Sequence, residues 1–121
     1  MSQKIRKTNP LLIDLINQLK KEAQDKNKPL WKDVALRLQK SSKNWPEVTL
    51  KRIDKYVNEK ETALVPGKVL STGELSKKIP IAAWSFSEKA KQKIIDAGGS
   101  TMTIEELLEK NPEAKNIRIM G

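Results

Sequence analysis

The residues of this 121-residue chain that could do chemistry are lysines, carboxylates and three tryptophans, because histidine and cysteine are absent. Without these two types there is no Ser-His-Asp triad, no thiolate nucleophile, no disulfide and no cysteine-ligated zinc. Glu105, Glu106 and Glu109 form an acidic cluster, and paired carboxylates can serve acid–base or metal chemistry. Their place just after Thr103 favours a simpler interpretation, a helix start where the dipole stabilises negative charge.

Two glycine motifs suggest phosphate binding but lack the required spacing. A P-loop needs two glycines five residues apart, followed by Lys and Ser or Thr, whereas Gly67-Lys68 is followed by Val69. Gly98-Gly99 follows a predicted helix, although an anion site needs the amides at a helix start. We therefore interpret the first motif as a turn and the second as a helix stop.

The tryptophans could stack on nucleotide bases, but the helical spacing around Trp31 predicts that this one lies in the hydrophobic core. Trp31 lies on the apolar face of a predicted helix, whereas Trp45 stands beside Pro46 in a basic loop and is the more open case. The pattern shows no aromatic RNA-binding motif and no stacking platform for single strands.

Positive charge is concentrated in the first half of the chain. The formal net charge is +9; residues 1–60 carry 15 Lys and Arg against 7 Asp and Glu, and residues 61–121 carry 9 against 8. This asymmetry predicts a polyanionic partner, and the 20 lysines against 4 arginines favour phosphate neutralisation over base reading. No apolar run approaches a membrane span and no secretory signal is visible, so we expect a soluble cytoplasmic protein. The polyanion could be nucleic acid or a membrane surface, but the polar face of the first predicted helix is mixed in charge, so we expect no membrane partner.

The helices and strands that position these side chains can be predicted from the spacing of apolar residues and from capping, proline and glycine residues. Asn9-Pro10 predicts a helix over about 10–24, Pro29 opens a second, and Thr49 caps a third. Residues 40–44 are predicted as a loop. The first half is thus expected to be helical with basic outer faces.

The second half changes to short apolar runs. Residues 63–65 and 69–70 predict short extended pieces separated by Pro66-Gly67, and residues 79–86 predict an edge strand or one that begins with a bulge, because of Pro80. A helix capped by Ser85 or Ser87 follows, then a strand, a helix with a capping box at 103–106, and a strand at 117–119. This order predicts a mixed α/β single domain: a basic helical part at 1–60, then a strand-strand-helix body at 61–121.

Several blocks together resemble one family. They are Val-Pro-Gly-Lys-Val-Leu at 65–70, Ser-Thr-Gly-Glu-Leu at 71–75, Ile-Ala-Ala at 81–83, Ala-Gly-Gly at 97–99, Thr-Ile-Glu-Glu-Leu at 103–107 and, earlier, Lys-Thr-Asn-Pro at 7–10 and Trp-Lys-Asp-Val-Ala at 31–35. In this combination the chain resembles the large-subunit ribosomal protein eighteen of archaea and eukaryotes, and its short length favours the archaeal form. The resemblance implies an irregular α/β fold and a structural role without enzymatic activity, cofactor or small-molecule substrate. The implied partners are large-subunit (23S-type) ribosomal RNA and neighbouring ribosomal proteins.

The predicted RNA contacts combine the basic half with the polar turns beside the family motif. They are Lys4, Arg6, Lys7, Lys20, Lys21, Lys28, Lys40, Lys43, Lys51, Arg52, Lys55, Lys68, Lys77 and Lys78. Two other hypotheses stay open at this point. A DNA-binding chromatin-type protein would share the charge argument, and a lysine- or carboxylate-dependent enzyme would need a perturbed residue in a pocket.

Overall fold

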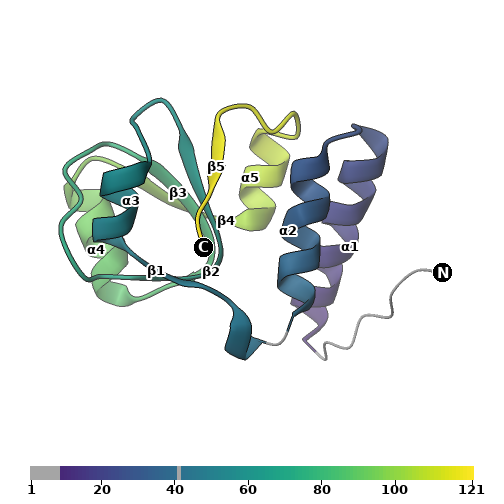
Figure 1. Ribbon diagram of the computed structural model, residues 1–121, viewed down its shortest axis with the longest axis horizontal. Coiled ribbons are helices and arrows are strands. Elements are labelled where there is room, and N and C mark those ends of the chain that lie inside the picture. The colour runs from purple at the N-terminus through teal and green to yellow at the C-terminus, as the bar shows by residue number, and fades with distance from the viewer. Residues whose placement is uncertain (1–8, 41) are drawn as a thin grey trace.

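The computed structural model describes residues 9–40 and 42–121, so the predicted contacts Lys4, Arg6 and Lys7 lie outside the described residues. The helices are α1 (Pro10–Asp25), α2 (Pro29–Gln39), α3 (Leu50–Tyr56), α4 (Glu88–Asp96) and α5 (Ile104–Lys110), with a short 3-10 turn, η1 (Ser42–Asn44). The strands are β1 (Glu47–Thr49), β2 (Thr62–Leu70), β3 (Pro80–Phe86), β4 (Ser100–Thr103) and β5 (Ile117–Ile119). Figure 1 shows α1 and α2 side by side at one end of the molecule.

The five strands form one parallel sheet, and β2 pairs with three of the other four strands. The order is β1-β2-β3-β4, and β5 also pairs with β2. Because β3 occupies one edge of β2, β1 and β5 divide the other: β5 pairs with residues 62–64 and β1 with residues 68–70. The mixed α/β fold class is confirmed, although the strands are joined more regularly than the implied irregular body. Since β1 lies within residues 1–60, that part is not purely helical and shares the sheet with the rest.

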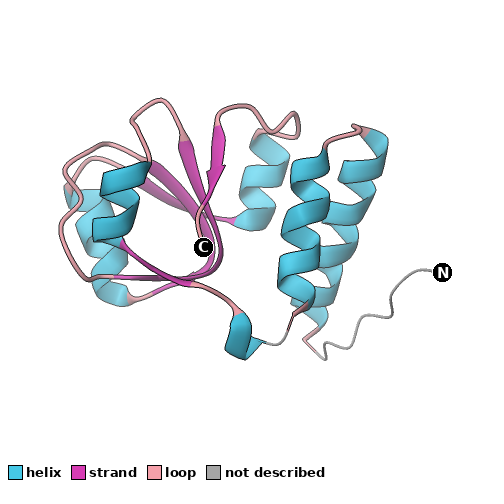
Figure 2. Cartoon of the chain, in the orientation of Figure 1, coloured by secondary structure: helices cyan, strands magenta, loops and turns pink. Residues whose placement is uncertain are grey.

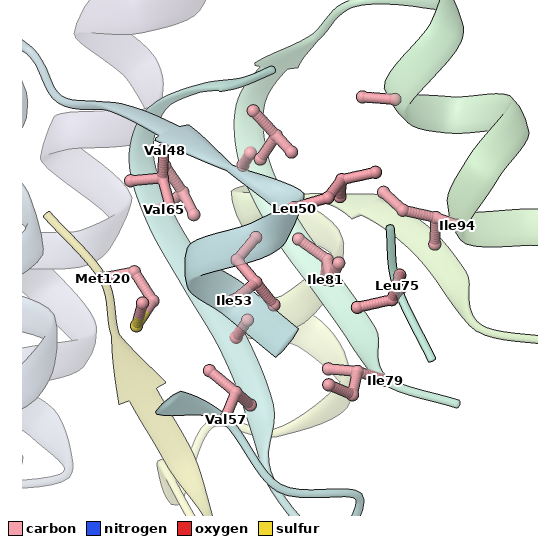
Figure 3. Close-up of a cluster of buried hydrophobic side chains, with 14 residues drawn as sticks. Val48, Leu50, Ile53, Val57, Val65, Leu75, Ile79, Ile81, Ile94 and Met120 are labelled. Atoms are coloured by element: carbon pink, nitrogen blue, oxygen red, sulfur yellow. The ribbon is translucent and has the colours of Figure 1, made fainter. Parts of the chain in front are cut away.

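Helices cover both faces of the sheet, as expected for parallel strands. Figure 2 shows α3 and α4 on one side and α5, α1 and α2 on the other. Figure 3 shows the first core, where Leu50, Ile53 and Ile94 from the helices meet Val65 and Ile81 from the sheet. The second core joins the opposite strand residues, Leu64 and Ala82, to α1, α2 and α5.

The expected break at Pro66-Gly67 is wrong, because β2 continues through it as one nine-residue strand. The pairing with β3 shifts register between Val65 and Lys68, which places the proline and glycine in a bulge. Gly67 also lies against the preceding segment: a Cβ there would overlap the carbonyl oxygen of Pro46. That carbonyl accepts a hydrogen bond from the Lys68 N–H at 3.0 Å. Gly67 is therefore needed for a close backbone approach and does not form a turn.

The prediction that residues 79–86 form an edge strand, or one that begins with a bulge, is also wrong. This strand, β3, lies inside the sheet between β2 and β4. Pro80 is the first residue of the strand and pairs with Ser100 without a register shift. At that position a proline is tolerated in a sheet. Of the two proposed caps for α4, Ser87 is the one used, because its hydroxyl accepts from the Ala90 N–H at 3.2 Å.

The other helix boundaries agree with the local signals. Asn9 caps α1 through the Leu11 N–H at 3.0 Å, and Thr49 caps α3 through Arg52 N–H. The predicted capping box is present at α5, where Thr103 and Glu106 each bind the other's backbone N–H. Gly98, at φ +87°, follows the end of α4 and confirms the predicted helix stop. Among the described residues, no helix is long and apolar enough to cross a membrane.

Candidate nucleic-acid interface

The densest exposed group of predicted contacts lies on the outer face of α3. Because Leu50, Ile53 and Val57 are buried, the helical period turns Lys51, Arg52 and Lys55 outward, and all three are exposed. Within the described chain none of the three forms an ion pair with a carboxylate. The α3 basic face, defined as Lys51, Arg52 and Lys55, is thus available to an external anion.

Tyr56 extends this face and was not singled out by the sequence. Its side chain is 52% exposed, and the Lys55 ammonium lies 5.3 Å from the centre of the ring. The signal was present in the sequence, since Tyr56 follows Ile53 at a spacing that turns it away from the buried face.

The remaining predicted contacts differ in how far their side chains are exposed. Exposed ones are Lys21, Lys40, Lys43, Lys68 and Lys78. Lys20 is half-buried on α1, and Lys28 pairs with Glu113 at 3.6 Å. These lysines are spread over several elements, so the structure brings together only some of the predicted set.

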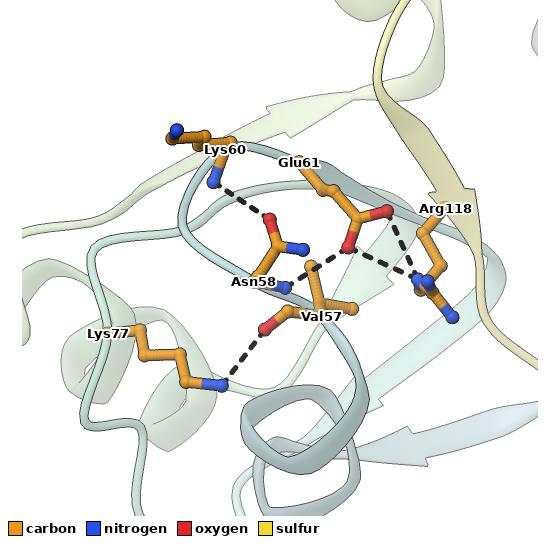
Figure 4. A network of polar contacts seen from close by, with 6 residues as sticks. All are labelled: Val57, Asn58, Lys60, Glu61, Lys77 and Arg118. Atoms are coloured by element: carbon orange, nitrogen blue, oxygen red, sulfur yellow. Dashed lines mark hydrogen bonds and ion pairs between the residues drawn. The ribbon is translucent and has the colours of Figure 1, made fainter.

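Lys77 is engaged by backbone carbonyls. Its ammonium donates to the carbonyl oxygen of Asp54 at 2.6 Å, in the last turn of α3. It also donates to the carbonyl oxygen of Val57 at 3.2 Å, directly after that helix (Figure 4). A cation here satisfies carbonyls that the helix leaves unpaired. Lys93 makes a similar arrangement on α4, donating to the carbonyls of Ser71 and Gly73 and pairing with Glu74 at 3.2 Å.

A second polar network ties β5 to the turn before β2. The Glu61 carboxylate accepts from the Asn58 N–H at 3.2 Å and from the Arg118 guanidinium at 3.2 Å (Figure 4). The Asn58 hydrogen bond is the main cause that lowers the pKa of Glu61 below its usual 4.5, and Arg118 acts in the same direction. Arg118 therefore forms an ion pair with Glu61 that connects β5 to the turn before β2.

The acidic cluster at 105–109 is explained by helix capping. The Thr103 backbone N–H donates to the Glu106 carboxylate at 3.0 Å, and this hydrogen bond is the main cause that lowers the pKa of Glu106. Among the described residues no group of three or more acidic side chains could hold a metal ion. Glu106 is thus part of a capping box at the start of α5.

Two predicted lysines line one hollow between the start of β1 and the end of β3. Lys43 and Lys68 line a hollow of about 310 Å³ together with Trp45 and Ser85. An adjoining hollow of about 350 Å³ is lined by Trp84 and Lys91, and Ser85 belongs to both. Sequence analysis missed Lys91, although its place between the buried Ala90 and Ile94 turns it outward.

The tryptophans take up different positions. Trp31 is fully buried, as its place on the apolar face predicted, and its indole N–H donates to the Pro112 carbonyl at 2.8 Å. Trp45 is half-buried, and its ring meets that of Trp84 edge to face, with centroids 5.8 Å apart. Trp31 therefore lies inside the second core, whereas Trp45 and Trp84 are half-buried and pack against it.

Comparison with known proteins places the chain among the ribosomal proteins. The family model described as ribosomal protein 60S L18 and 50S L18e matches residues 2–121. The chain belongs to this family, whose members are structural components and not enzymes.

Curated relatives match over nearly the whole length of both chains. The large ribosomal subunit protein eL18 of Methanothermobacter thermautotrophicus is 44% identical over 120 residues, which cover 99% of each chain. The protein of the same name from Archaeoglobus fulgidus is 47% identical over 116 residues, or 96% of this chain and 99% of that one. These relatives give no support to the DNA-binding hypothesis.

Proposed function

We propose that this ribosomal protein binds folded large-subunit ribosomal RNA in the cytoplasmic ribosome through exposed lysine and arginine side chains. The observation that carries the proposal is the α3 basic face, whose three cations have no carboxylate partner among the described residues. Cations that contact phosphates release condensed counterions, which supplies affinity without reading sequence. Because the major groove of A-form RNA is too deep for side chains, recognition is expected to be of shape and backbone.

The predicted contacts contribute unequally in this proposal. The exposed cations bind phosphates, whereas Lys77 and Lys28 serve the fold through their carbonyl and Glu113 contacts. The contacts predicted at Lys4, Arg6 and Lys7 remain part of the proposal on charge alone.

Neighbouring large-subunit proteins are the second class of partner in the proposal. Three large aliphatic side chains, Leu11, Leu36 and Ile95, are exposed at 74%, 41% and 58%. Single exposed apolar residues are ordinary in a protein surface, so the support here is the near-neutral charge of residues 61–121 together with family membership.

The test is the salt dependence of RNA binding. The double variant Arg52→Gln/Lys55→Gln removes two charges from the α3 basic face, and each lost phosphate contact lowers the slope of log K against log salt by about 0.9 on a duplex. Filter binding to 23S-type rRNA transcribed in vitro should therefore show a slope reduced by about 1.8.

The matched control removes the same charge from another surface. Lys110 and Lys115 are exposed in the near-neutral half, so Lys110→Gln/Lys115→Gln should keep the wild-type slope. A wild-type slope near zero contradicts the proposal. Equal affinity for a duplex DNA of the same length supports the DNA-binding alternative instead.

A further inference from the structure

The two hollows adjoin at Ser85, which lies near the carboxyl end of β3 and lines both. The hollow lined by Thr101 and Thr103 lies at the carboxyl ends of β3 and β4, whereas the other lies between the start of β1 and the same end of β3. In parallel α/β sheets, ligands bind outside the carboxyl ends of the strands. At about 350 and 310 Å³, each hollow stands near the lower limit of small-molecule pockets, which suits a single small group rather than a helix.

Each hollow has an indole ring in its wall. Trp84 lines the hollow beside β4, and Trp45 lines the one beside β1. The edge-to-face contact at 74° holds the two rings, and the Trp45 N–H is fixed by the Lys40 carbonyl at 3.1 Å. A flat π-system can therefore stack on a ring that is already positioned, which limits the entropy cost of binding.

The charge around the rings is positive. Lys43 and Lys68 line the Trp45 hollow, and Lys91 lines the Trp84 hollow. The lining carboxylates are Glu47 and Glu106, and Glu106 already binds the Thr103 N–H. None of the three lysines forms an ion pair within the part of the chain that the structure describes. The surroundings thus favour an occupant that is both aromatic and anionic.

We propose that one unpaired nucleotide of the bound RNA occupies the Trp84 hollow, with its base stacked on the indole and its phosphate held by Lys91. The strand continues over Ser85, so that an adjacent phosphate meets Lys43 and Lys68. Paired bases cannot enter, because a duplex hides their faces, whereas extruded bases stack readily on aromatic rings. This inference rests on the proposed RNA binding and adds a specific site to it.

The experiment uses the full chain and two probes, the 23S-type rRNA transcript and a single-stranded hexauridylate. Stacking on a tryptophan quenches its fluorescence, so wild-type protein should show saturable quenching by the hexamer. Trp84→Leu keeps an apolar side chain but no ring, and should bind the hexamer about five- to a hundredfold more weakly. Trp84→Phe keeps a ring and should retain most of the affinity. Lys91→Gln should lower the salt slope by about 0.7, the value for one single-strand phosphate.

The matched control is Lys89→Gln, which removes an exposed charge from α4 outside the hollow and should leave quenching and slope unchanged. The nucleotide site is overturned if wild-type protein binds the rRNA with a steep salt slope while Trp84→Leu and Lys91→Gln bind both probes as wild type does. That result leaves the proposed function intact. A wild-type slope near zero with rRNA contradicts both proposals. Melting curves check that Trp84→Leu folds, and Lys91→Gln carries the test if it does not.

Discussion

Gly67 allows β2 to pass against the Trp45–Pro46 segment, and its replacement by alanine tests how tightly that crossing is packed. A Cβ at this position would overlap the Pro46 carbonyl oxygen and lie 3.1 Å from the Pro46 carbonyl carbon. Overpacking of a filled site costs about 1–3 kcal/mol. The displaced carbonyl also loses the Lys68 N–H, at a cost of about 1 kcal/mol. We expect Gly67→Ala to lower the free energy of unfolding by about 2–4 kcal/mol.

The sign of the effect discriminates between two physical accounts. The φ angle of Gly67 is outside the left-handed region, so its backbone is open to alanine. If space were available, alanine would stabilise the protein by about 0.4–1 kcal/mol, because it restricts the unfolded chain. Urea unfolding followed by circular dichroism measures the difference. Lys68→Ala keeps the backbone N–H and should stay within about 0.5 kcal/mol of wild type. A Gly67→Ala chain as stable as wild type would refute the close-approach argument.

Three further predictions concern the capping and charge networks. Lys77→Met removes the cation that binds the carbonyls of Asp54 and Val57, so it should lower the free energy of unfolding by about 1.5–3 kcal/mol. The salt slope of rRNA binding should stay unchanged. A reduced slope in filter binding would instead indicate that Lys77 contacts RNA. Thr103→Ala removes the cap of α5 and should lower the free energy of unfolding, measured with urea, by about 1 kcal/mol. An unchanged urea midpoint would contradict the capping role of Thr103. Because the folded pKa values of Glu61 and Glu106 lie below the usual 4.5, the unfolded chain takes up protons first as the pH falls. Stability should therefore decrease as the pH falls below 4.5, and the double variant Glu61→Gln/Glu106→Gln should show a flatter acid branch in pH-dependent melting.

The sequence predicted the elements that carry their own local signals. Asn9, Thr49 and Thr103 each cap a helix where the pattern placed one, because capping depends on neighbouring residues only. The wrong predictions concern segments where contacts with distant residues outweigh local turn signals such as proline and glycine. Pro66-Gly67 reads as a turn, but the glycine is present because the Pro46 backbone passes against it.

Sheet order and the roles of individual cations depend on distant contacts in the same way. Nothing local indicates that β3 lies between β2 and β4, or that β1 and β5 share one edge. Lys77 and Lys78 are adjacent and identical in type, yet one binds two carbonyls and the other is exposed. The two hollows combine residues of η1, the first four strands, α4 and α5. The sequence therefore showed the concentration of charge beforehand but not the site.

The division of one β2 edge between two short strands has a consequence for synthesis. A chain emerges from its amino terminus, so β2, its partners β1 and β3, and β4 are all made before β5. Until residues 117–119 arrive, the backbone of β2 at 62–64 has an open edge, and open edges are templates for aggregation. Parallel pairing between distant segments is also intrinsically slow. Pairing with β5 therefore closes a strand edge that the newly made chain would otherwise offer to other chains.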